Sequence, residues 1–87
     1  MQHRTSPSAF ALLIGIADRL DAKYATKAVS ERLVLAQALV VAEELHGPTP
    51  EAEDAEQAIL HLLPAVTGQT RGEYSTQLRL VAVGVSL

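Results

Sequence analysis

The chain has 87 residues, so by length it forms at most one small domain, which buries roughly 60–65% of its surface on folding. Hydrophobic residues make up 48% of the sequence, only 3% of the residues are aromatic, and there is no cysteine, which excludes a disordered chain, a disulfide scaffold and thiolate chemistry. The net charge of −3 has the wrong sign for a typical nucleic-acid binder and argues against nucleic acid as the main partner.

The first expected element is a helix over residues 7–24, which follows a loose arm at residues 1–5. Ser6 is a good N-cap, and Pro7 suits the first helical position because its missing N–H costs nothing there. The apolar run in this helix, like a second run at residues 33–42, has only about half the length of a transmembrane helix. The run also lies where a secretory signal would place its apolar region, but Arg4 gives it a weak positive flank. We therefore expect a cytoplasmic protein without a membrane span.

A second helix is expected over residues 27–46, capped by Thr26 and ended by Gly47-Pro48. This helix is apolar on two faces, so it must be the central element or part of a subunit interface. We expect the first face to close the core of one chain, and it consists of Val29, Leu33, Ala36 and Val40. We expect the second face to meet a second chain, and the candidate interface residues are Val34, Ala38, Val41 and Leu45, extended by Leu35, Leu39 and Ala42.

Two further helices are expected in the second half of the chain. The third spans residues 50–63, with Thr49 as its cap, four acidic residues in its first turns and Pro64 as its stop. The fourth spans residues 71–83 and begins with a capping box between Thr70 and Glu73. The Val-rich tail at residues 78–87 is compatible with either helix or strand. The sequence thus predicts an all-α fold: a small bundle of three to four helices in a single domain at residues 6–87, completed by dimerisation.

Two histidines were considered as sites of chemistry. Glu43 and His46 have the Glu-x-x-His spacing of di-iron helix bundles, but the further carboxylates that such a centre needs are missing. We interpret His46 instead as a residue that suits the C-terminus of a helix. Gln57 lies four residues before His61 and is an amide, so it cannot hold that imidazole as a carboxylate would. We therefore expect no catalytic residue, no metal and no cofactor.

A basic stripe is the remaining candidate for binding. Arg19, Lys23 and Lys27 recur every four residues and are candidate phosphate contacts. Asp18 and Asp21 lie close by, so a solvated face of ion pairs is the favoured interpretation. The leading functional hypothesis is a non-enzymatic, homodimeric protein that acts through contact with an unknown protein partner, in a regulatory, adaptor or inhibitory role. The alternative is a dimeric, nucleic-acid-associated regulator that uses the basic stripe.

Overall fold

The computed structural model describes residues 6–86 of the chain, and the side chains of residues 9–85. The expected N-terminal arm at residues 1–5 and the final residue, Leu87, lie outside the described residues. Four helices are present: α1 (Ser6–Ala22), α2 (Glu31–His46), α3 (Pro50–Leu60) and α4 (Arg71–Ser86). No strand occurs between residues 6 and 86, so the prediction of a small all-α bundle is confirmed.

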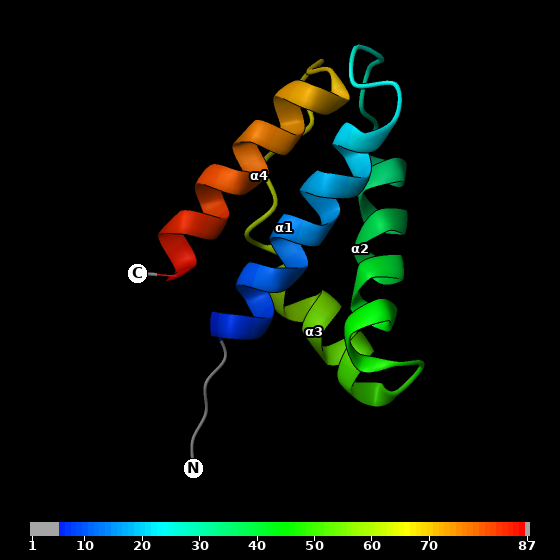
Figure 1. Cartoon of the computed structure of the whole chain (residues 1–87), viewed down its shortest axis with the longest axis vertical. Helices are drawn as coiled ribbons and strands as arrows, with labels where there is room; N and C mark the ends of the chain where they lie inside the picture. Colours follow the sequence, from blue (N-terminus) through cyan, green and yellow to red (C-terminus); the bar gives the residue numbers. More distant parts are fainter. Residues whose placement is uncertain (1–5, 87) are drawn as a thin grey trace.

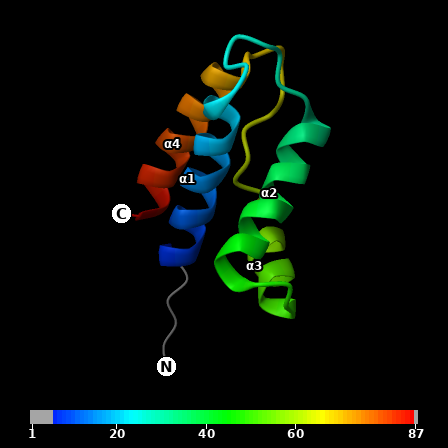
Figure 2. The same ribbon diagram turned by 45° about the vertical axis from the view of Figure 1, so that its right-hand side comes forward.

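The central position in the bundle belongs to α1, whereas the sequence analysis had offered that role to the second helix. α1 packs against all three other helices, and the backbone of α4 lies close to the backbone of α1 alone. Figures 1 and 2 show α4 and α2 on opposite sides of α1, each running antiparallel to it, with α3 crossing one end of the molecule. The connection between α3 and α4 runs back along the molecule to the opposite end.

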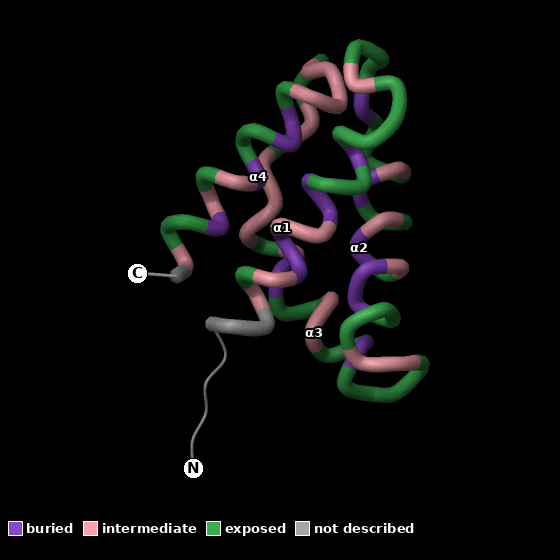
Figure 3. Tube along the Cα trace, viewed as in Figure 1, coloured by how far each residue is buried: buried purple, intermediate pink, exposed green. Residues whose placement is uncertain are grey.

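The core lies where the helices face α1, and buried positions recur along the chain in Figure 3. Its largest side chains are Leu12, Leu13 and Ile16 of α1, Ile59 of α3, and Tyr74 and Leu78 of α4. The accessible surface of 5220 Å² is close to the roughly 5,000 Å² expected of a compact monomer of this mass. The high share of hydrophobic residues, 48% of the sequence, therefore does not enlarge the surface, and many of these residues are buried inside the single chain.

The predicted start of the second helix is wrong by four residues. α2 begins at Glu31, and its N-cap is Ser30, whose hydroxyl accepts a hydrogen bond from the Leu33 N–H at 3.1 Å. The preceding residues form a connection, in which Tyr24 adopts a left-handed conformation with φ of 58°. Val29 is buried as a connection residue, and its N–H donates to the Gln69 carbonyl at 3.0 Å. These partners from a distant segment override the local helical pattern.

The same connection also caps the start of α4. The Arg71 N–H donates to the Lys27 carbonyl at 2.8 Å, and the Gly72 N–H donates to the Ala25 carbonyl at 2.9 Å. Amides in the first turn of a helix have no partner within the helix, so these two bonds satisfy groups that would otherwise need water. The connection between α1 and α2 is thereby tied to the start of α4 (Figure 1).

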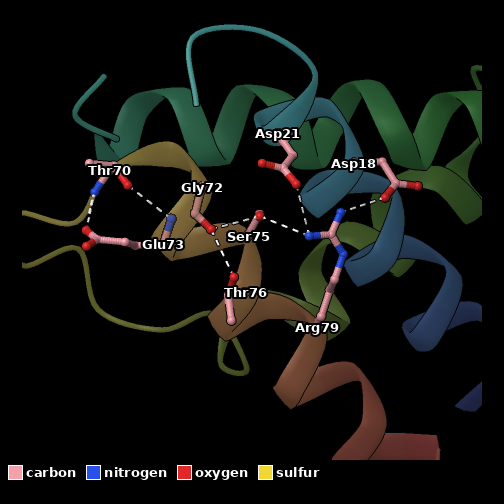
Figure 4. A network of polar contacts seen from close by, with 8 residues as sticks. All are labelled: Asp18, Asp21, Thr70, Gly72, Glu73, Ser75, Thr76 and Arg79. Carbon is pink, nitrogen blue, oxygen red and sulfur yellow. Dashed lines mark hydrogen bonds and ion pairs between the residues drawn. The ribbon is translucent and has the colours of Figure 1, made fainter. Parts of the chain in front are cut away.

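The predicted capping box of the fourth helix is confirmed. The Thr70 N–H donates to Glu73 Oε1 at 2.8 Å, and the Glu73 N–H donates to Thr70 Oγ1 at 3.1 Å (Figure 4). α4 continues to Ser86, three residues beyond the predicted end. The alternative left open for the tail is therefore resolved as helix over residues 78–86.

α3 is shorter than predicted. It ends at Leu60, and residues 61–63 form a turn before Pro64. The Pro64 carbonyl accepts a hydrogen bond from the Tyr74 hydroxyl at 2.6 Å, which fixes the connection onto α4. Thr49 occupies the N-cap position of α3 as predicted, but its hydroxyl donates to the His46 carbonyl instead of accepting from α3.

An ion-pair cluster joins α4 to α1. Arg79 lies 2.9 Å from Asp18 and 3.2 Å from Asp21, and it also donates to the Ser75 hydroxyl at 3.1 Å (Figure 4). The hydrogen bond to Asp18 is the main cause that raises the pKa of the Arg79 guanidinium above its ordinary value. The two aspartates near the predicted basic stripe thus share one guanidinium of α4, which compensates one of their two negative charges.

Candidate functional site

Three of the four predicted interface residues belong to the core of the single chain. Val34, Ala38 and Val41 are 2%, 0% and 3% exposed, whereas Leu45 is 47% exposed. This face of α2 is therefore turned inward and packs within one molecule. An interface on α2 has to use a different set of side chains.

The outward side of α2 carries a continuous row of exposed residues, which we call the α2 outer stripe. Its members recur at helical spacing and are Arg32, Leu35, Ala36, Leu39 and Glu43. Leu35 and Leu39 are 40% and 41% exposed. The stripe therefore has an apolar centre between a positive residue near the start of the helix and a negative residue near its end.

The two charged residues of the α2 outer stripe do not stabilise α2 itself. A cation near the N-terminus of a helix and an anion near its C-terminus both oppose the helix dipole. Arg32 and Glu43 occupy these unfavourable positions, and within the described part of the chain neither side chain makes an ion pair or a hydrogen bond. By contrast, the neighbouring Glu44 is bound to Arg19 at 2.9 Å.

Two clefts of about 310 Å³ each border the stripe on the side of α3. The first lies beside Leu35 and is lined mainly by apolar side chains, including Leu60, Leu63, Pro64 and Val66. The second lies beside Leu39 and Glu43, at the turn between α2 and α3. The accessible apolar surface thus extends beyond α2 to the neighbouring helix and connection.

The predicted basic stripe is divided by the structure. Arg19 and Lys23 line a cleft of about 390 Å³ at the end of the molecule where α1, α2 and the start of α4 meet. We call this the basic cleft. Lys27 is not part of its lining, and its Nζ atom lies 5.1 Å from the centre of the Tyr24 ring. Arg71, which the sequence analysis did not select, replaces Lys27 as the third cation of the cleft.

The guanidinium of Arg19 is already engaged. Its Nε donates to Gln37 Oε1 at 2.6 Å, and one terminal nitrogen binds Glu44 Oε2 at 2.9 Å. Lys23 has no ion pair or hydrogen bond among the described residues. The charge that the cleft offers therefore comes from Lys23 and Arg71.

Arg71 is held by packing and not by an acidic partner. Its guanidinium lies 5.6 Å from the centre of the Tyr24 ring, and its Nε is buried with no hydrogen-bond partner in the described structure. No local sequence signal indicates this role, because Arg71 is remote from Lys23 along the chain. Only the pairing of the two connections, seen in the isolated bridge between Ala28 and Thr70, brings the two residues to one end of the molecule.

Over the described residues, no group of three His, Cys, Asp or Glu side chains is placed to hold a metal ion. In the same part of the chain, no helix has the length and apolar character needed to cross a membrane. No protein-family model matches the chain, and searches among curated proteins and solved structures find no match either. The class of protein is therefore defined by the architecture of the described residues: a small all-α chain of four helices, three of which pack against α1.

Proposed function

We propose that this chain is a non-enzymatic interaction protein that works as a homodimer joined through the α2 outer stripe. The observation that carries the proposal is the order of residues along the stripe. When two copies of α2 lie antiparallel, Arg32 of one copy lies opposite Glu43 of the other, and Leu35 and Leu39 fill the space between the two ion pairs. The stripe is therefore complementary to itself, as a two-fold interface requires.

The pairing offsets the unfavourable interaction of Arg32 and Glu43 with the dipole of their own helix. Each residue that opposes the dipole of its own helix gains an opposite charge from the second copy, and the two-fold axis makes two such pairs. The axis passes between Gln37 and Ala38, so that Ala36 of one copy lies opposite Leu39 of the other. Since each chain carries a net charge of −3, two copies repel each other in general, and the stripe supplies the one arrangement that offsets this repulsion.

The size of the surface is compatible with a dimer. α2 has 16 residues and is therefore about 24 Å long. Its stripe continues into the two bordering clefts, which receive leucine side chains of the second copy. We expect the interface to exceed the roughly 1,000 Å² that a stable association needs.

The regulatory, adaptor or inhibitory role and the cytoplasmic location belong to the same proposal. A two-fold dimer presents two copies of each surface that lies outside the interface. Because the two α2 helices are antiparallel, the two basic clefts lie at opposite ends of the assembly. Such a dimer is suited to engage two partner groups at once and to gain avidity by doing so.

Charge reversal tests the proposal while leaving the fold intact. Arg32→Glu and Glu43→Arg each favour α2 electrostatically, because each places the correct sign at its end of the helix. We expect each single variant to dissociate into monomers and the double variant, Arg32→Glu with Glu43→Arg, to dimerise again. Sedimentation velocity measures this directly, since the dimer has twice the chain mass of 9.3 kDa. Lys27→Glu is the matched control with the same change of charge outside the stripe.

Two results would contradict the proposed dimer. The first is a wild-type chain that sediments as a monomer at about 50 μM, a concentration at which a micromolar dimer is mostly assembled. The second is a double variant that stays monomeric while its helix content equals that of the wild type. Leu39→Glu adds an independent check, because a buried, unpaired carboxylate at the centre of the stripe abolishes the dimer.

The alternative function, a nucleic-acid-associated regulator, rests on the three cations at one end of the chain. Lys23, Lys27 and Arg71 lie there together, whereas Arg19 is neutralised by Glu44. In the antiparallel dimer the two basic ends point apart and do not form a single stripe. Salt-dependent retention on heparin tests this alternative, and no retention at low salt, where phosphate contacts are strongest, would overturn it.

A further inference from the structure

The basic cleft offers a binding site that is distinct from the α2 outer stripe. We propose that it binds the phosphate monoester group of a small organic molecule, with Lys23 and Arg71 as the residues that recognise the phosphate. The cleft combines positive charge, an arginine whose Nε is buried without a hydrogen-bond partner among the described residues, and apolar walls. This inference does not depend on the proposed dimer.

The charge of the cleft matches a phosphate monoester. Of the three cations in its lining, Arg19 is neutralised by Glu44, so Lys23 and Arg71 contribute two positive charges. The nearby Asp21 shares Arg79 with Asp18, so this cluster keeps one negative charge, but no acidic side chain lines the cleft itself. A phosphate monoester carries about −1.5 to −2 charges at pH 7, whereas a single carboxylate would compensate only one of the two cations.

Arg71 is prepared for an anion by its surroundings. Its Nε is buried and has no hydrogen-bond partner among the described residues, and its guanidinium is positioned beside the Tyr24 ring at 5.6 Å. A buried charged donor group without a partner is unfavourable, and an anion beside the same guanidinium offsets part of that cost. The planar guanidinium can present two parallel N–H donors to a phosphate, which the Lys23 ammonium then approaches as a point charge.

Tyr24 gives the cleft its second unusual feature. Its φ of 58° is a left-handed conformation that is uncommon for a residue other than glycine. Such conformations persist where the surroundings determine them, and they concentrate at ligand sites. Here the conformation places the Tyr24 ring, which is 61% exposed, in the lining of the cleft. The ring lies near the cations of Lys27 and Arg71.

The walls of the cleft indicate that the ligand has an organic part. Leu20, Ala22 and Leu33 line it together with Tyr24, and the volume of about 390 Å³ lies within the range of small-molecule sites, about 300–1,000 Å³. Gln37 accepts from Arg19 through Oε1, which leaves its amide N–H groups available to donate. A sugar phosphate or a nucleoside monophosphate has this combination of an anionic end and a neutral, partly apolar body.

The test is a titration followed by amide chemical shifts, with inorganic phosphate, ribose 5-phosphate, AMP and adenosine as probes. We expect saturable shifts at residues 19–24, 33, 37 and 71 with every phosphate-bearing probe. Tighter binding of AMP than of ribose 5-phosphate identifies a nucleotide site, and the reverse identifies a sugar-phosphate site. Both Lys23→Gln and Arg71→Gln should weaken binding at least about tenfold. Gln57→Glu, which makes the same change of net charge on α3, outside both the cleft and the α2 outer stripe, should change it by less than about twofold.

Several results would overturn this inference. The inference fails if no phosphate-bearing probe gives a saturable shift up to about 10 mM, because a specific site has a dissociation constant of about 1 mM or lower. Equal losses in the Gln57→Glu variant would show a general electrostatic effect and not a site. Adenosine binding as tightly as AMP would show that the phosphate is not recognised. A single-stranded oligonucleotide that binds far more tightly than AMP would indicate an extended nucleic-acid surface instead, if its affinity also falls steeply with salt concentration because many counterions are released. Lys23 is exposed, so its variant gives an answer even where Arg71→Gln perturbs the fold.

Discussion

Gly15→Ala tests the packing of α1 against α2, on which the outward position of the α2 outer stripe depends. A Cβ atom at Gly15 would lie 2.5 Å from Val41 Cγ1 and 3.5 Å from Val41 Cγ2. The first distance is about 1 Å shorter than ordinary contact between carbon atoms. The absence of a side chain at residue 15 therefore lets Val41 pack directly onto the backbone of α1.

Two opposing terms set the size of the effect. Alanine is favoured over glycine within a helix by about 1 kcal/mol. Overpacking a filled core costs about 1–3 kcal/mol, and the upper part of this range applies because Val41 is β-branched and only 3% exposed, so it has no free rotamer. We expect a net destabilisation of about 1–2 kcal/mol, which for a domain of this size lowers the melting temperature by about 5–15 °C.

Thermal unfolding followed by circular dichroism measures this effect, with Gly84→Ala as the matched control. A Cβ at Gly84, near the end of α4, meets no atom within 4 Å, so the control should be neutral or slightly stabilised. In a Val41→Ala background the clash disappears, and Gly15→Ala should then raise the melting temperature. A Gly15→Ala chain that melts above the wild type would refute the close packing of α1 on α2.

Three further predictions concern α4. Burial of the Tyr74 hydroxyl and, to a lesser extent, the negative charge of Glu31 raise the pKa of Tyr74 from 10.0 to about 12. The neutral Tyr74 therefore stabilises the folded chain fully below pH 10, and this contribution is lost as the pH rises from 10 to 12. In urea titrations, Tyr74→Phe should remove this loss and cost about 1 kcal/mol at neutral pH, because the hydrogen bond to Pro64 is absent. Thr70→Ala should destabilise the chain by about 1 kcal/mol in the same assay through loss of the capping box. Arg79→Gln should cost less than about 1 kcal/mol, since its ion pairs are partly exposed, but should speed amide exchange in α4 relative to α2.

The helices that local patterns define were predictable from the sequence. The capping box at Thr70 and Glu73 and the turn at Gly47 and Pro48 depend on residues within a few positions of each other, and the structure contains both. The start of α2 was not predictable in this way. Residues 27–30 have a helical pattern, but the Lys27 carbonyl and the Val29 N–H bond to the backbone of Arg71 and Gln69, and no property of the local sequence specifies that pairing.

The residues of the candidate sites also divide into those that the local sequence predicts and those that depend on tertiary pairing. Arg19 and Lys23 were selected because they lie one helical turn apart, and the structure places both in the basic cleft. Arg71 was missed, because it reaches the cleft only through the tertiary pairing of the two connections. The two apolar faces of the second helix were visible in the sequence, but the close approach of Val41 to Gly15 of α1 appears only in the structure.

We propose α2 for the dimer, and not the equally accessible α4, because of specificity. Leu80 on α4 is 69% exposed, which is more than either leucine of the α2 outer stripe. The exposed residues one turn before it, Thr76 and Gln77, are uncharged, and the exposed Glu73 beyond them is engaged in the capping box with Thr70. Complementary charges mainly supply register and selectivity, whereas apolar area alone favours many arrangements. The α2 outer stripe has both, because Arg32 and Glu43 bracket its leucines, and only one antiparallel register satisfies both ends at once.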